Sequence, residues 1–305
     1  RLVLKPGAKV MFTVNKPDAG FVNGQTGTVI VCGRDEVLVD CDGMPLRVGI
    51  VDYLNSWPLA WGFLAGEMED LEPAYLPPAG VADGLARGEL DVGLVPSIEV
   101  QRIDGLGVVP GLCVAATHEV RSVLLVAERR FEEVRSVALD ENSRTSAALV
   151  HIILGELYGV RAESSPRAPE LAEMLRSADA ALVIGDPALH VDRERYRILD
   201  LAAAWRRLTG RPFVFAVWAV RRGVPTDGLR TTLAASLDRG VREMDGIVDR
   251  AVDRLGLTPE VVERYLLRHL RFAMGSDELA GLEEFYRRAH EHGLIGEPRP
   301  LEFVD

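Results

Sequence analysis

Short apolar runs alternate with helix-length segments along most of the chain. The runs are rich in valine, isoleucine and leucine and end in small polar residues or glycine, as buried strands that enter turns do. We predict strands at residues 47–52, 71–76, 91–95, 112–116, 122–127, 137–139, 180–184 and 213–220. Segments typical of helices lie at residues 58–65, 79–87, 147–158 and 170–176. This alternation predicts an α/β protein with parallel sheets.

The last quarter of the chain has a different pattern, with helices predicted at residues 226–245, 246–255, 259–272 and 276–292. Before it, two blocks each resemble a small doubly wound domain, and the strand at 213–220 returns the chain to the first block. Two connections between two lobes are typical of a type II periplasmic-binding-protein-like fold. We therefore expect an α/β structure of two lobes with parallel-rich sheets and an interlobe cleft. Lobe 1 would contain residues 44–127 and 215–305, and lobe 2 residues 128–214.

Residues 1–43 contain three short β-rich runs, at 9–14, 27–32 and 36–40, separated by turn-forming residues. We expect a β-rich extension of SH3-like type, a fused or upstream-translated remnant outside the site. The segment Pro6-Gly-Ala-Lys-Val-Met-Phe-Thr-Val-Asn15 resembles the C-terminal β-module of Pif1/RecD-type helicases. The chain contains no GxxxxGK[ST] phosphate-binding motif, so this resemblance implies no helicase activity.

Composition and charge narrow the classes of function. The chain has 305 residues, of which 48% are hydrophobic and 27% charged, as in a soluble globular protein of two domains. Its net charge of −11 argues against a nucleic-acid partner, which would need a basic surface. No apolar run is long enough to span a membrane and no signal peptide is visible, so we expect a cytoplasmic protein without a membrane partner. The sequence makes no prediction of the oligomeric state.

Metal and thiol chemistry find little support in the sequence. The three cysteines Cys32, Cys41 and Cys113 have neither the spacing of a disulfide framework nor that of a metal site. The six histidines form no constellation with them. We therefore expect no metal and no cofactor.

Polar residues follow four of the predicted strands. They are Asn55-Ser56, Pro96-Ser97, Ser143 to Ser146, and Gly185-Asp186. The first three precede predicted helix starts, where hydroxyl groups and free N–H groups together bind anions. Each group alone is also typical of an ordinary helix cap, but strand ends that meet at one cleft favour a ligand site.

Asn55 is the most informative member of this set because its amide both donates and accepts hydrogen bonds and cannot ionise. Such a group can orient an anion or a departing hydroxyl. Asp52, Glu99 and Asp186 are candidate acids or bases, and each also suits a structural role.

Several long motifs resemble the chorismate dehydratases of the futalosine pathway of menaquinone biosynthesis. They include Tyr53-Leu-Asn-Ser-Trp-Pro-Leu59, Gly88-Glu-Leu-Asp-Val-Gly-Leu-Val-Pro-Ser-Ile-Glu99, Ser143-Arg-Thr-Ser146, Thr209-Gly-Arg-Pro-Phe-Val-Phe-Ala-Val-Trp218 and Gly281-Leu-Glu-Glu-Phe-Tyr286. The resemblance runs in order from about Met44 to the C-terminus. It implies a lyase that converts chorismate into 3-[(1-carboxyvinyl)oxy]benzoate and water, without a metal or organic cofactor.

The resemblance also implies roles for particular residues. Asn55 and Ser97 would act at the reacting centre. A second group would bind the substrate: Ser56, Ser122, Ser143, Thr145, Ser146 and, from its place at a strand end, Asp186. No side chain has a clear claim to be the base, and a substrate carboxylate could take that part. Arg121 stands where the family leads us to expect a small residue.

Two other functions remain open from the sequence. A non-catalytic cytoplasmic protein of the same fold could bind or sense a small anion. A nucleic-acid module in residues 1–43 is the weakest alternative, since the net charge of −11 opposes it.

Overall fold

The computed structural model describes residues 4–14, 16, 23–32, 37–41, 45–66, 68 and 71–304. The chain divides into two compact units, one of Arg1–Leu46 with Glu69–Glu72 and one of Arg47–Met68 with Pro73–Asp305. Met44, where we expect the second part of the chain to begin, lies outside the described residues, as does the first residue of the strand expected at 36–40.

The smaller unit contains a three-stranded antiparallel sheet in the order β1 (Lys9–Met11), β2 (Thr26–Cys32) and β3 (Val37–Cys41). These strands fall on the three β-rich runs of the sequence. Val29 of the central strand is buried, whereas Met11 and Val31 are exposed. Val29 is thus the one fully buried apolar side chain among the described residues of this sheet.

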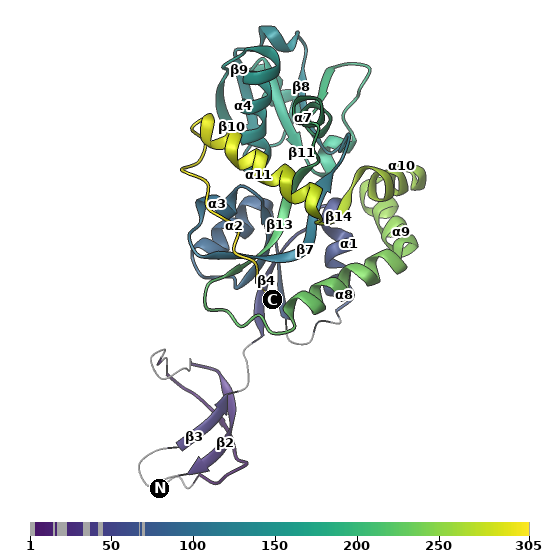
Figure 1. Cartoon of the computed structure of the whole chain (residues 1–305). Coiled ribbons are helices and arrows are strands. Elements are labelled where there is room, and N and C mark those ends of the chain that lie inside the picture. The colour runs from purple at the N-terminus through teal and green to yellow at the C-terminus, as the bar shows by residue number, and fades with distance from the viewer. Residues whose placement is uncertain are drawn as a thin grey trace. The chain divides into compact units, whose positions relative to one another are not determined.

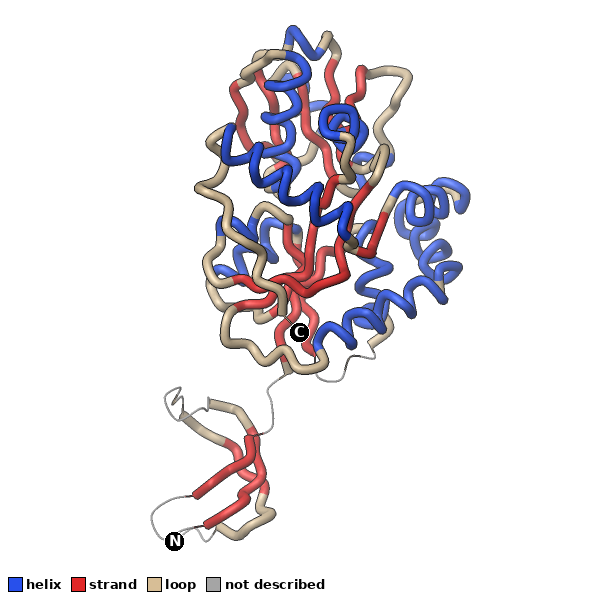
Figure 2. Tube along the Cα trace, viewed as in Figure 1, coloured by secondary structure: helices blue, strands red, loops and turns tan. Residues whose placement is uncertain are grey.

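The larger unit contains two sheets, seen in Figures 1 and 2. The first has the order β14 (Arg271–Ala273), β7 (Leu106–Ala116), β13 (Phe213–Arg221), β6 (Val92–Pro96), β4 (Leu46–Val51) and β5 (Leu71–Leu76). The second has the order β10 (Glu163–Arg167), β9 (Ser136–Asp140), β11 (Ala180–Ile184), β8 (Val123–Ala127) and β12 (Arg197–Asp200). Strand β8, which we assigned to the first lobe, belongs to the second sheet, so we propose that the lobe boundary precedes it.

The sheets are mixed, which corrects the expectation of parallel-rich sheets. Parallel pairs join β4 to β6 and β9 to both β10 and β11. Antiparallel pairs join β13 to β6 and β7, and β8 to β11 and β12. The reason is the route of the chain: β7 leads out of the first sheet and β13 leads back into it, so these neighbours run in opposite directions.

Helices cover both sheets (Figure 2). Their bounds are α1 (Trp57–Leu64), α2 (Pro78–Ala86), α3 (Glu99–Arg102), α4 (Thr145–Tyr158), α5 (Leu171–Ser177), α6 (Asp186–Leu189), α7 (Leu201–Thr209), α8 (Leu229–Arg242), α9 (Met244–Leu255), α10 (Pro259–Arg264) and α11 (Ser276–Glu291). Two of them show why they begin and end where they do. The Asp200 carboxylate accepts hydrogen bonds from two N–H groups of the first turn of α7, and Gly159 ends α4 in the left-handed conformation at φ 64°.

The helix expected at residues 259–272 is interrupted. Helix α10 ends at Arg264, a π-helical turn spans Tyr265–His269, and the chain then forms the edge strand β14. Pairing with β7 satisfies backbone groups of β14 that a continued helix would have bonded internally. Helical periodicity could not reveal this, because the competing partner lies far away in the sequence. Among the described residues no helix is long and apolar enough to cross a membrane.

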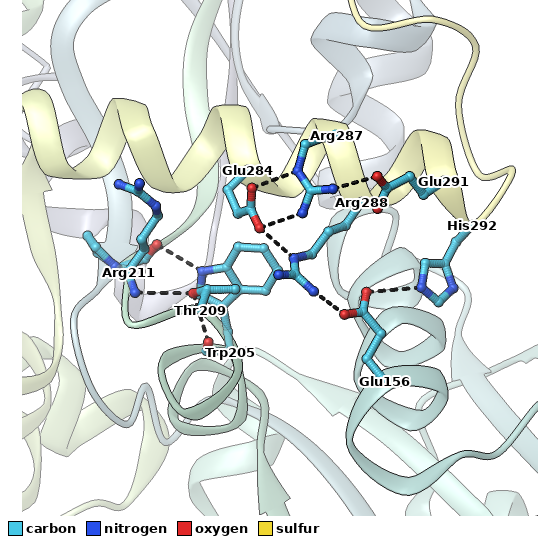
Figure 3. A network of polar contacts seen from close by, with 10 residues as sticks. Glu156, Trp205, Thr209, Arg211, Glu284, Arg287, Arg288, Glu291 and His292 are labelled. Atoms are coloured by element: carbon cyan, nitrogen blue, oxygen red, sulfur yellow. Dashed lines mark hydrogen bonds and ion pairs between the residues drawn. The ribbon is translucent and has the colours of Figure 1, made fainter.

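Helix α11 packs on β13 of the first sheet and on α4 of the second lobe (Figure 1). A polar network anchors it, shown in Figure 3. Arg288 of α11 bonds to Glu156 of α4, and its Nε lies 2.7 Å from an oxygen of Glu284. His292 approaches the same Glu156 at 3.1 Å. The C-terminal helix thereby joins elements of the two lobes.

Candidate active site

Residues from both lobes line a cavity. The first lobe contributes Val51, Tyr53, Asn55, Ser56, Pro78, Leu94, Pro96, Val114, Phe215 and Ala216. The second contributes Val123, Asn142, Ser143, Arg144, Thr145, Ser146, Ile184 and Gly185. Five residues predicted for the site therefore meet here: Asn55, Ser56, Ser143, Thr145 and Ser146.

Asn55 lies in the short 3-10 turn Leu54–Ser56 that connects β4 to α1. The turn is held from both sides: the Leu54 N–H donates to Oδ1 of Asp186 at 2.9 Å, and the Ser56 hydroxyl bonds to the carbonyl of Tyr53 at 2.7 Å. Within the described residues the Asn55 side chain has no hydrogen-bond partner, although it lines the cavity. Its amide is therefore available to a ligand.

The start of α4 supplies a second set of free donors. Its N-cap residue, Arg144, makes no side-chain cap, so the first-turn N–H groups have no acceptor from that residue. The Ser143 hydroxyl is buried and has no partner among the described residues, and Ser146 is only 6% exposed. Such a group of N–H and hydroxyl donors at the positive end of a fourteen-residue helix suits a carboxylate.

Three predicted site residues lie behind the cavity wall and do not line it. The Ser97 hydroxyl donates to the carbonyl of Val214 at 2.8 Å and lies 3.4 Å from the Thr145 hydroxyl. The Ser122 hydroxyl accepts a 2.6 Å hydrogen bond from Tyr265. The Asp186 carboxylate accepts the hydrogen bond from the Leu54 N–H that holds the turn containing Asn55. Each of the three supports a part of the wall.

The lining residues carry almost no charge. They include no Asp, Glu or His, and Arg144 is their one ionised side chain. Its Nη2 atom lies 3.0 Å from Oδ1 of Asp83 in α2, so this ion pair spans the two lobes. The wall of the pocket therefore offers an anion neutral hydrogen-bond donors and one cationic side chain, that of Arg144.

Two buried carboxyl groups lie close to the phenol of Tyr53. Burial raises the pKa of Asp140, and it raises the pKa of Asp186 to about 6. Burial, and to a smaller extent the negative charge of these two acids, raises the pKa of Tyr53 to about 12. Its phenol therefore stays protonated at neutral pH. The Tyr53 ring packs on Gly185, where a Cβ atom would lie 2.8 Å from the ring and where φ is 67°. Both facts demand glycine at this position.

Sequence reasoning did not assign roles to Tyr53, Asn142, Arg144 or Phe215, which also line the cavity. Tyr53, Arg144 and Phe215 stand inside the motifs that carry the family resemblance, and this signal could have found them. The remaining candidate acids are occupied elsewhere: Asp52 pairs with Arg254 at 2.8 Å and Glu99 with Arg102 at 3.1 Å. Over the described ranges no cluster of three His, Cys, Asp or Glu residues could hold a metal ion.

Comparison with known proteins identifies the family. The model of a family described as menaquinone biosynthesis matches residues 46–291. The chain belongs to this family. It is 30% identical over 261 residues to a protein named chorismate dehydratase from Thermus thermophilus, a match that covers 79% of this chain and 94% of that protein. A chorismate dehydratase from Campylobacter jejuni is 29% identical over 176 residues, covering 57% of this chain and 60% of the relative. Since the family match begins at residue 46, the helicase resemblance of residues 1–43 is not borne out.

Solved structures confirm the fold class. A protein from Archaeoglobus fulgidus superimposes with a TM-score of 0.67 at 16% identity, covering 82% of this chain and 98% of that one. The alkanesulfonate-binding protein of Xanthomonas axonopodis pv. citri gives a TM-score of 0.60 at 17% identity over 86% and 96% of the two chains. The periplasmic aliphatic sulphonate-binding protein of Escherichia coli gives 0.57 at 16% identity over 84% and 95%. The larger unit therefore has the predicted periplasmic-binding-protein-like fold.

Proposed function

We propose that this member of the menaquinone biosynthesis family removes water from chorismate and releases 3-[(1-carboxyvinyl)oxy]benzoate. The observation that carries the proposal is a cavity in which the Asn55 amide and the Ser143 hydroxyl have no partner within the described residues. The family match and the relatives named chorismate dehydratase support the choice of substrate.

Chorismate is a dianion, and the cavity offers two places for its carboxylates. One carboxylate binds at the start of α4, where the Ser143 and Ser146 hydroxyls and the first N–H groups lie. The other lies toward Arg144, whose guanidinium can exchange its ion pair with Asp83 for one with the substrate. Ser97 and Thr145 act as positioning residues, because their hydroxyls join β6 to the start of α4 at 3.4 Å.

The reaction breaks a C–H bond and a C–O bond on neighbouring ring carbons. The electron pair of the C–H bond enters the ring, hydroxide departs with a proton as water, and aromatisation supplies the driving force. Asn55 donates its amide N–H to the oxygen or carboxylate on which negative charge grows. Since the lining residues include no Asp, Glu or His, we propose that a carboxylate of the substrate itself removes the ring proton.

The proposed partner is thus a small molecule, and no cofactor enters the reaction. A cytoplasmic location and the lack of a nucleic-acid partner stay predictions from the sequence.

Incubation of the full chain with chorismate tests the proposal. We expect many equivalents of chorismate to be converted per protein, with a product lighter by one water in the mass spectrum. Saturable chorismate binding with full recovery of chorismate would instead establish the non-catalytic binding protein as the function. The variant Asn55→Ala serves as the control for a contaminating dehydratase, because its preparation would carry the same contaminant.

A further inference from the structure

A second cavity, of about 370 Å³, lies apart from the proposed active site and is rich in cationic side chains. Arg121 reaches it from the connection between β7 and β8, Arg193 from the segment after α6, and Arg264 from the end of α10. His269 of the π-helical turn also lines it, beside the apolar side chains of Leu189 and Val261. Three separate segments of the chain therefore converge on one pocket.

The positive charge of this cavity is only partly neutralised. Glu119 lies 3.7 Å from the Arg121 guanidinium and 3.5 Å from Nδ1 of His269. The Asp200 carboxylate accepts hydrogen bonds from the N–H groups of Val120 and Arg121 and also caps α7. Glu119 and Asp200 thus lie beside Arg121 without lining the pocket, and both already have partners.

Arg193 and Arg264 have no carboxylate partner among the described residues. The Arg193 guanidinium donates to the carbonyl of Arg121 at 3.4 Å, and burial together with the charge of Arg121 lowers its pKa. Of the three guanidinium groups at the pocket, only that of Arg121 lies within ion-pair distance of a carboxylate among the described residues. Like charges held together in this way raise the free energy of the empty site, and an anion would lower it.

Two further features constrain residues of the pocket, whose Arg193 and Arg264 side chains are themselves exposed. Arg121 is the one non-glycine described residue with positive φ, at 67°, a conformation that its hydrogen bond to Asp200 at 2.7 Å helps to hold. The Nε2 atom of His269 is buried, has no partner among the described residues and belongs to a ring that is only 11% exposed. A buried, unpartnered nitrogen of this kind is costly unless a ligand bonds to it.

We propose that this cavity is a binding site for a phosphate-class dianion, distinct from the chorismate cavity. Guanidinium groups bind phosphate through paired N–H donors, and three of them can share a doubly charged group. Leu189 and Val261, which also line the cavity, would contact an organic body attached to the phosphate. The inference does not rest on the proposed activity, because none of these residues lines the cavity of Asn55.

Calorimetric titration of the full chain with inorganic phosphate tests the proposal, with chloride keeping the ionic strength constant. We expect saturable binding, and a dissociation constant at least about tenfold larger in both Arg193→Gln and Arg264→Gln. The matched control is Arg268→Gln, which removes the same charge from the π-helical turn that follows Arg264 but does not line the cavity. It should leave the dissociation constant unchanged.

A parallel titration with glycerol 3-phosphate distinguishes the two sources of the phosphate. Tighter binding than inorganic phosphate assigns the site to an organic phosphate, and weaker binding assigns it to the free ion. The absence of saturable binding by both probes would overturn the proposal, as would equal weakening in Arg268→Gln. So would a phosphate signal that is lost in Ser143→Ala but kept in Arg193→Gln, because the ligand would then lie in the chorismate cavity.

Discussion

At the scale of single residues, two neighbours in the turn after β4 have opposite roles. Asn55 lines the cavity and has no partner within the described residues, whereas the Ser56 hydroxyl is buried and bonded to main-chain carbonyl groups of its own turn. Function should therefore depend on the first side chain and stability on the second.

We predict that Asn55→Ala lowers kcat/KM for chorismate by about 100-fold, the usual effect of removing one donor to a developing negative charge. Its free energy of unfolding should change by less than about 0.5 kcal/mol. Ser56→Ala, the control, should lower the free energy of unfolding by about 1 kcal/mol, because it removes the buried hydrogen bond from the hydroxyl to the carbonyl of Tyr53. Steady-state kinetics and urea unfolding of both variants check this, and wild-type turnover by Asn55→Ala would refute the role of Asn55.

Asp186 gives a prediction for pH. Burial raises its pKa in the folded protein to about 6 from 3.8, so the folded state keeps this proton to a higher pH than the unfolded state does. Its contribution to the free energy of unfolding is therefore largest below about pH 4 and declines as the pH rises to about 6, by about 3 kcal/mol in all.

Asp186→Asn keeps an oxygen for the Leu54 N–H and removes the titration. The difference in free energy of unfolding between this variant and the wild type should grow in the variant's favour from pH 4 to pH 7. Urea unfolding over that range measures it. A constant difference would show that Asp186 is not protonated in the folded protein at pH 4 to 6.

Eight site residues were predicted from the sequence and five of them line the cavity, because strand-end position is visible in the pattern. It could not separate lining residues from supporting ones. Ser97, Ser122 and Asp186 look like their neighbours in sequence, yet their side chains bond to distant partners such as Val214, Tyr265 and Leu54. Which side chain stays free is decided by tertiary packing.

At the scale of elements, local signals located most helices and strands but not their pairing. The helix predicted at 147–158 has the observed end of α4, and the buried strand at 180–184 was predicted with its observed bounds. The edge strands β10, β12 and β14 were missed, because exposed or short strands lack an apolar run. The direction of β13 depends on its path between lobes, which no local pattern records.

The close packing of α11 against the segment before β13 gives a prediction at this scale. A Cβ atom on Gly281 would overlap the carbonyl oxygen of Pro212, the same oxygen that accepts the Trp205 indole N–H at 3.1 Å. We expect Gly281→Ala to lower the free energy of unfolding by about 1–3 kcal/mol, the usual cost of overpacking. Denaturant unfolding measures this effect.

The matched control is Gly246→Ala in α9, where the new methyl would lie 3.5 Å from Trp61, an ordinary contact. Its better helix propensity should stabilise the protein by about 0.5–1 kcal/mol. Equal effects of the two substitutions would contradict the close packing of α11 on the segment before β13.

At the scale of the whole molecule, the fold explains how a cavity with a nearly uncharged wall can hold a dianion. The first lobe supplies Asn55 and the second supplies the donors at the start of α4, so a ligand must contact both lobes at once. The ion pair between Arg144 and Asp83 also joins the lobes. The two-lobed fold was predictable from the alternation of strands and helices. Which donors each lobe contributes to the cavity could be learned only from the structure.

The most direct test is a single-turnover measurement with the protein in excess over chorismate. We predict conversion of all chorismate to 3-[(1-carboxyvinyl)oxy]benzoate and water by the wild-type protein, and a rate about 100-fold lower for Asn55→Ala under the same conditions. Quantitative recovery of unchanged chorismate from the wild-type complex would contradict the assignment and leave a protein that binds without reaction.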